Sequence, residues 1–147
     1  MQNVDLSLSR NEFETLVKLA YLGNWVANAA REENEELAPY ARLEQVVFKR
    51  AAEAGLTELV EYSDEHALYF PTDALEEAEA EHITDYDDAQ FWEELPDRLA
   101  MRDMALKYSD KTVAAMDIDE AAEKAQPFME KYWNEIEKHG LDRLKVA

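Results

Sequence analysis

Glycine and proline are scarce in this chain, and their scarcity restricts what it can fold into. The 147 residues include three glycines and four prolines, whereas an all-β protein needs many turns built from these residues. Residues with high helix propensity, such as Ala, Glu and Leu, are abundant instead. With 47% hydrophobic residues, a chain of this length can bury a core. We therefore expect an all-α fold, a single domain over residues 1–147 built as a bundle of five or six helices.

A capping box and a long apolar run mark the first helix. Ser9 and Glu12 have the S-x-x-E spacing in which each side chain satisfies a backbone N–H of the other residue. Residues 13–30 are apolar nearly all round a helical wheel, which is typical of a central, buried helix. Asn24 and Asn28, four residues apart, interrupt this surface and are candidates for lining a pocket or for setting helix register.

Proline and glycine residues mark where the next helix is expected to begin and end. Pro39 suits the first turn of a second helix, and Gly55 followed by Leu56 suits its left-handed end with an apolar contact. Residues 57–71 are ambiguous, because TELVEY fits a short helix and HALYFP fits an extended or irregular segment before Pro71.

The second half of the chain is expected to be helical, with breaks. Three helices are expected, at residues 73–85, from a cap at Asp87 or Asp88 through residue 108, and at residues 117–140. Pro96 and Pro127 fall inside the last two, where a proline removes one hydrogen bond and usually kinks the helix.

Acidic residues are concentrated in one segment, residues 58–97. This segment holds fifteen Asp and Glu residues and no Lys or Arg, so it carries −15 of the formal net charge of −19. Nucleic acids and anionic lipids are polyanions, which so negative a surface repels. We therefore expect a protein partner with a basic surface, and neither direct nucleic-acid binding nor attachment to a membrane.

The first residues of the chain and the first helix also bear on where in the cell the protein is expected. MQNVDLSLSR has no basic stretch followed by an apolar run, so it does not fit a signal peptide, and the apolar run of the first helix is too short and polar to span a bilayer. The expected location is cytoplasmic.

The helix at residues 73–85 has an amphipathic pattern. Its carboxylates, Glu79 included, spread over one broad arc of the wheel, and Leu75 and His82 lie on the opposite arc, so His82 is expected in the interior. The predicted acidic surface consists of Asp73, Glu76, Glu77, Glu81, Asp85, Asp87 and Asp88.

Glu79 and His82 have the E-x-x-H spacing with which helical di-iron proteins place two ligands on one face. Such sites need a second pair, and neither His66 nor His139 has a Glu three residues before it. We therefore predict no metal and no cofactor, and we keep Glu79 and His82 as candidates for a small-molecule site.

Arg98 and Arg102 are expected on or beside the apolar side of the fourth helix. An arginine in such a place either pairs with a carboxylate or forms an anion pocket with its neighbour. The chain has no cysteine, no P-loop and no nucleophile elbow, so catalysis is unsupported. His82, Glu79 and Arg102 are the residues to mutate first in a search for activity.

Three functional hypotheses follow from these patterns. The first is a non-enzymatic helical module that binds protein partners, or a second copy of itself, through the acidic segment 58–97. The second is an acidic mimic of DNA, because the charge spacing along the acidic helix is close to that of phosphates along a DNA strand. The third is a helical protein with a small-molecule or metal site near His82.

Overall fold

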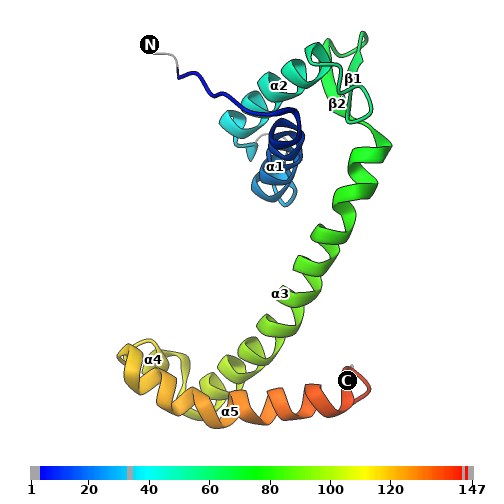
Figure 1. Cartoon of the computed structure of the whole chain (residues 1–147). Coiled ribbons are helices and arrows are strands. Elements are labelled where there is room, and N and C mark those ends of the chain that lie inside the picture. Colours follow the sequence, from blue (N-terminus) through cyan, green and yellow to red (C-terminus); the bar gives the residue numbers. More distant parts are fainter. Residues whose placement is uncertain (1–3, 33–34, 144, 146–147) are drawn as a thin grey trace. The chain divides into compact units, whose positions relative to one another are not determined.

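The computed structural model of the protein describes residues 4–32, 35–143 and 145, and it is predominantly α-helical, as predicted (Figure 1). Within the described residues the elements are α1 (Arg10–Asn28), α2 (Ala38–Glu53), β1 (Val60–Ser63), β2 (Leu68–Pro71), α3 (Asp73–Tyr108), α4 (Asp110–Val113) and α5 (Ile118–His139). They group into two compact units, Met1–Thr84 and Asp85–Ala147, and the boundary falls inside α3. The single domain expected over residues 1–147 stays a prediction. None of the described helices has both the length and the apolar character needed to cross a membrane.

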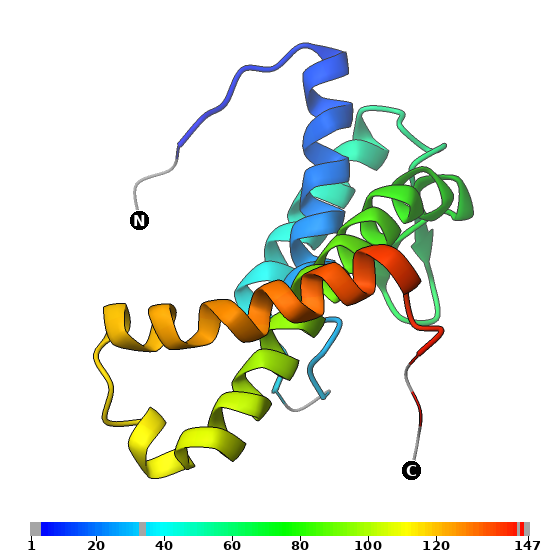
Figure 2. The same ribbon diagram turned by 90° about the horizontal axis from the view of Figure 1, so that it is seen from below.

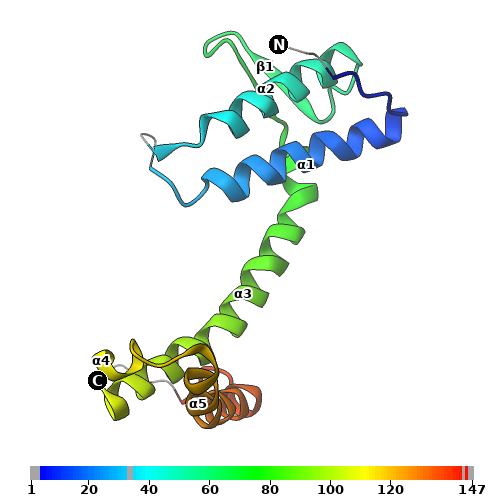
Figure 3. The same cartoon turned by 90° about the vertical axis from the view of Figure 1, so that its left-hand side faces the viewer.

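Helices α1 and α2 lie side by side in the first unit (Figure 3). The capping box is confirmed, since the Ser9 side chain accepts from the backbone N–H of Glu12 and the Glu12 carboxylate accepts from that of Ser9. The two helices, the strands and the start of α3 share one core, made of Val17, Val47, Phe48, Ala51, Leu56, Val60 and Leu75.

Helix α1 is less buried than its sequence predicts. Val17 is fully buried, whereas Leu19 and Val26 are 59% and 63% exposed. The expectation of a central helix buried all round is therefore wrong. Within the described part of this unit α1 packs through one face, against α2 and the core, and its other apolar face stays exposed.

Helix α2 begins and ends as its sequence predicts. Pro39 lies in its first turn, and residues 33–34 of the preceding connection lie outside the described residues. Gly55 has φ +78°, and the N–H of Leu56 donates to the carbonyl of Ala51 over 2.9 Å. The buried side chain of Leu56 completes this left-handed cap.

A β-hairpin follows α2, where the sequence was ambiguous. β1 and β2 are antiparallel, with Val60 opposite Pro71 and Ser63 opposite Leu68. The short helix considered for TELVEY is thus wrong over residues 60–62, which belong to β1. HALYFP is extended over Leu68–Pro71, whereas His66 and Ala67 lie in the turn of the hairpin. Gln45 of α2 explains in part why this segment is extended. Its side-chain amide donates to the carbonyl of Tyr69 and accepts from the N–H of Tyr69, and these two hydrogen bonds hold β2 against α2.

Helix α3 is a single helix of 36 residues, so the expected break and new cap at Asp87 or Asp88 are wrong. Its start at Thr72 is a genuine cap, since Thr72 Oγ1 accepts from the N–H of Leu75. Exposed aspartates inside a helix cost less than 1 kcal/mol each, which good helix formers on both sides can offset. The helix also continues through Pro96, which has no N–H to donate to the carbonyl of Trp92.

The second unit contains the rest of α3, the short helix α4 and α5 (Figure 2). Asp117 caps α5 by accepting from the N–H of Glu120, and the helix ends at Gly140, which has φ +53°. Pro127 lies inside α5, as predicted. The buried residues of this unit are Pro96, Ala100, Met104 and Ala125.

Candidate functional site

The seven residues of the predicted acidic surface are all exposed on α3. Asp73 and Glu76 occupy its first turn, where the helix dipole favours negative charge. Among the described residues, the ion pairs that involve α3 use Glu79, Glu94 and Asp103, and none uses a residue of the acidic surface. These carboxylates are therefore not neutralised by a cation of the described chain.

Glu79 and His82 differ in burial from what the sequence predicts, because Glu79 is buried and His82 is exposed. Glu79 is 3% exposed and pairs with Lys18 of α1 over 3.2 Å between Nζ and Oε1, whereas His82 is exposed. The prediction that His82 lies in the interior is wrong, and so is the placement of Glu79 on the solvated arc.

The position along α3, more than the face, separates the two residues. Leu75 enters the core and Glu79 lies one turn after it, whereas His82 lies two turns after Leu75, on nearly the same face, and is exposed. A buried carboxylate needs a partner, and Lys18 supplies it from within the apolar run of α1. A lysine in an otherwise apolar helix is the sequence signal that could have revealed this pair.

Asn24 and Asn28 form a chain of hydrogen bonds between α1 and α2. Asn28 donates to Asn24 Oδ1 over 2.7 Å, and Asn24 donates to Glu44 Oε2 over 2.9 Å. Asn28 Oδ1 also accepts from the N–H of Leu37 over 2.7 Å. The two asparagines are thus brought together, with a third polar partner, Glu44, which sequence reasoning missed.

Glu44 is half-buried beside a small pocket of about 120 Å³. Burial raises the pKa of its carboxyl to about 7, an effect that the Glu36 charge reinforces and the Asn24 hydrogen bond opposes. Leu19 and Leu43 form apolar walls of the pocket. This carboxyl can therefore change its protonation state near neutral pH, but the pocket holds only a few atoms.

Tyr21 of α1 lies near several carboxylates of α2 and α3. The pKa of its hydroxyl is raised, first by burial and then by the charges of Glu76, Glu44 and Glu79. Of these three carboxylates, Glu79 is the one that forms an ion pair with Lys18.

Arg98 and Arg102 do not form a common anion pocket. Arg98 pairs with Glu94, one turn earlier on α3, over 2.9 Å. Arg102 donates to Asp103 Oδ1 and to the hydroxyl of Tyr132 on α5. Each arginine thus has a separate partner, and both guanidinium groups are exposed.

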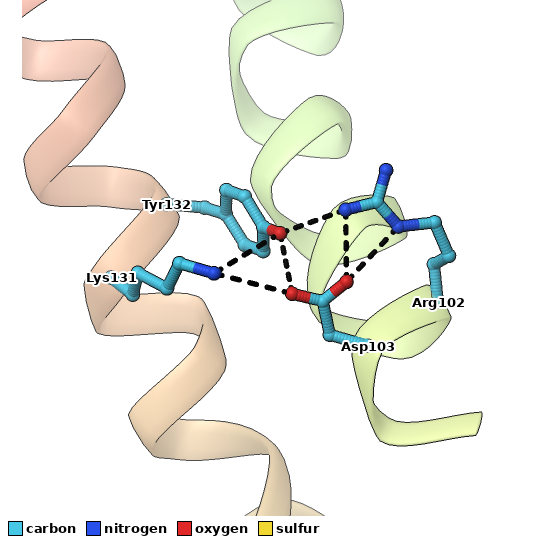
Figure 4. A network of polar contacts seen from close by, with 4 residues as sticks. All are labelled: Arg102, Asp103, Lys131 and Tyr132. Carbon is cyan, nitrogen blue, oxygen red and sulfur yellow. Dashed lines mark hydrogen bonds and ion pairs between the residues drawn. The ribbon is translucent and has the colours of Figure 1, made fainter. Parts of the chain in front are cut away.

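Asp103 is the centre of a polar network that joins α3 to α5 (Figure 4). The Tyr132 hydroxyl donates to Asp103 Oδ2 over 2.5 Å, and Lys131 lies 3.3 Å from the same oxygen. The hydrogen bonds from Tyr132 and Arg102 lower the pKa of the Asp103 carboxyl to about 2. Sequence reasoning missed Asp103 and Tyr132, because nothing local indicates that residues 29 positions apart will meet.

The same unit has an open hollow of about 630 Å³ between α3 and α5. Two partly exposed tryptophans line it, Trp92 at 37% and Trp133 at 42%. Asn134, Ile136, Glu137 and Gly140 complete the lining. Sequence reasoning could not show that the two tryptophans would share a surface, since they lie on different helices.

Within the described residues, no cluster of three or more His, Asp or Glu side chains is arranged to hold a metal ion. Glu79 is engaged with Lys18, and His82 lies on the exposed surface of α3. No family model, curated protein or solved structure matches this chain.

Proposed function

We propose that this chain binds a protein partner that presents a cationic surface, and that the acidic surface of α3 is what the partner meets. The observation that carries the proposal is the exposure of all seven carboxylates without an ion pair among the described residues. Residues 58–97 contain no Lys or Arg that could neutralise them.

The physical basis is long-range attraction combined with a low cost of binding. The helix backbone fixes where the exposed carboxylates emerge, so a cationic partner has to order only their side-chain torsions. A one-signed surface also steers the encounter and rejects anionic partners, which favours specificity and a fast association rate.

Charge reversal on one surface tests the proposal. The variant Glu76→Lys/Glu77→Lys/Glu81→Lys is titrated with an oligolysine peptide by calorimetry, at low and at physiological salt. At low salt we expect the affinity to fall about tenfold, because three exposed charge pairs are replaced by repulsion. The affinity of the original chain should itself fall as salt rises.

The matched control is Glu32→Lys/Glu35→Lys/Asp142→Lys, which changes the net charge by the same amount at exposed positions that do not belong to α3. We expect it to bind nearly as well as the original chain. Equal losses in both variants would mean that only net charge matters, and the acidic surface would not be the binding site.

A further inference from the structure

The tryptophan hollow of the second unit continues along α5. A second hollow of about 620 Å³ shares Trp133 and Asn134 with the first and is lined further by Glu123, Met129 and Glu130. We call the two hollows together the aromatic groove. All its residues belong to Asp85–Ala147, so the groove lies within one unit.

Three carboxylates stand along this groove at regular intervals. Glu123, Glu130 and Glu137 are seven residues apart on α5, so they project from nearly the same face at intervals of about 10 Å. All three are exposed, and in the described part of the chain none forms an ion pair. Lys138 lies beside Glu137 in sequence but about 100° further round the helix.

Three lysines of this unit lie over other aromatic rings. Lys107 and Lys124 lie about 5 Å from the ring centre of Tyr108, and Lys131 lies over its neighbour Tyr132. No cation of the described residues lies over Trp92 or Trp133, although indole is the ring that attracts cations best. The groove thus offers two indole rings that no cation of the described residues covers, although the Phe91 ring packs edge-on with that of Trp92. It also offers three carboxylates without an ion pair among the described residues, of which Glu130 accepts a hydrogen bond from Gln126.

We propose that the aromatic groove binds an extended basic segment of the protein partner, with an arginine or lysine side chain against the indoles of Trp92 and Trp133. An extended segment in the polyproline II conformation repeats every three residues, so its side chains at every third position project from one side at intervals of about 9 Å. This interval is close to the spacing of Glu123, Glu130 and Glu137. The inference rests on the proposed function in one respect, namely that the partner is cationic.

The network at Asp103 supports this assignment by fixing the position of α5. Tyr132 bonds Asp103 of α3, and the next residue, Trp133, faces the groove beside Trp92 of α3. The hydrogen bond therefore acts as a positioning contact, which holds the two indoles at the edges of one hollow.

Peptides of defined sequence test the groove without altering it. The probe is an acetylated peptide with arginine at every third position, and its partner peptide carries citrulline, a neutral isostere, at the same positions. In a Trp25→Phe variant, Trp92 and Trp133 are the remaining tryptophans, so their fluorescence reports binding directly. We expect saturable quenching by the arginine peptide and at least tenfold weaker binding of the citrulline peptide.

Substitutions in the groove provide the second test. Trp92→Leu/Trp133→Leu should weaken binding of the arginine peptide roughly 5- to 20-fold, since two cation–π contacts are lost. Trp25→Leu, the same chemical change on α1, should leave it unaltered. Glu123→Gln/Glu130→Gln/Glu137→Gln keeps the side-chain volumes and should also weaken binding, which guards against a folding defect in the tryptophan variant.

The outcomes separate this inference from the proposed function. If charge reversal on α3 weakens oligolysine binding while the groove variants bind the arginine peptide normally, the groove inference is wrong and the function stands. If the groove variants lose binding and the α3 variant does not, the groove stands and the α3 surface is not the site. Equal binding of the arginine and citrulline peptides would overturn the groove inference by itself.

Discussion

Two carboxylates of the first unit, Glu44 and Glu79, are shielded from water in different ways. Glu79 is almost fully buried but faces the ammonium of Lys18, so its charge is compensated. Glu44 is less buried, and among the described residues its side chain accepts a hydrogen bond only from the Asn24 amide. The amide carries no charge, so it does not fully offset the cost of burial, and the pKa of Glu44 is raised to about 7.

Replacing Glu44 by Gln should stabilise the protein above neutral pH and leave its stability nearly unchanged in mild acid. The pKa of Glu44 is raised on folding from an ordinary 4.5, so as pH rises the unfolded chain loses this proton first. The resulting penalty on the folded state grows between about pH 4.5 and 7 and is constant above that range.

The full shift corresponds to about 3 kcal/mol, and partial exposure to water reduces this to roughly 1–2 kcal/mol. Urea unfolding at about pH 4, 6 and 8, followed by circular dichroism, measures the difference between the variant and the original chain. Glu53→Gln on the same helix is the control, since Glu53 is exposed. A Glu44→Gln effect of equal size at all three pH values would contradict the prediction.

At the scale of secondary-structure elements, the position of α5 against α3 depends on a few side chains. The buried residues of the second unit are few and include small ones such as Ala100 and Ala125. The network of Asp103, Arg102 and Tyr132 therefore supplies directional contacts that a small apolar core cannot supply.

Removing the Tyr132 hydroxyl should loosen this contact. Tyr132→Phe leaves Asp103 without its shortest hydrogen bond, and we expect the melting temperature to fall on the order of 5 °C and the amides of α5 to exchange faster with deuterium. Tyr86→Phe, which removes an exposed hydroxyl from α3, should change neither measurement.

The same network has a defined dependence on pH. Because the pKa of Asp103 is lowered on folding from an ordinary 3.8 to about 2, its contribution is complete above about pH 4 and is lost as pH falls toward 2. The difference between Tyr132→Phe and the original chain should therefore shrink over that range. A difference that stays constant down to about pH 2 would argue against the hydrogen bond as its cause.

At the scale of the whole molecule, charge is the dominant feature. The formal net charge is −19, and the ion pairs of the described residues are mostly exposed, where each contributes at most about 1 kcal/mol. Repulsion among the carboxylates acts over longer distances than these pairs and opposes the compact state.

Salt should therefore stabilise the protein. Raising sodium chloride from low to physiological concentration and above weakens both repulsion and ion pairs, and with this charge imbalance the loss of repulsion dominates. We expect the melting temperature to rise by roughly a few degrees. The Glu76→Lys/Glu77→Lys/Glu81→Lys variant should show a smaller rise, and a melting temperature that falls with salt would contradict this account.

Local signals in the sequence determined the helical class and most helix ends. The capping box at Ser9, the left-handed end at Gly55 and the start of the last helix near residue 117 depend on contacts within a few residues, so they were predicted correctly. The exposure of the acidic surface was also predictable, because charged groups without partners stay in water.

Only the tertiary structure decided which face of each helix is buried and which distant residues meet. The wheel of α3 could not reveal that the core reaches Leu75 and Glu79 but not His82, or that Glu79 would meet Lys18. The meeting of Asp103 with Tyr132 and of Trp92 with Trp133 likewise depends on how α3 and α5 pack within their unit. Periodicity along a chain specifies a face relative to its own helix axis, whereas burial depends on the neighbour against which that face packs.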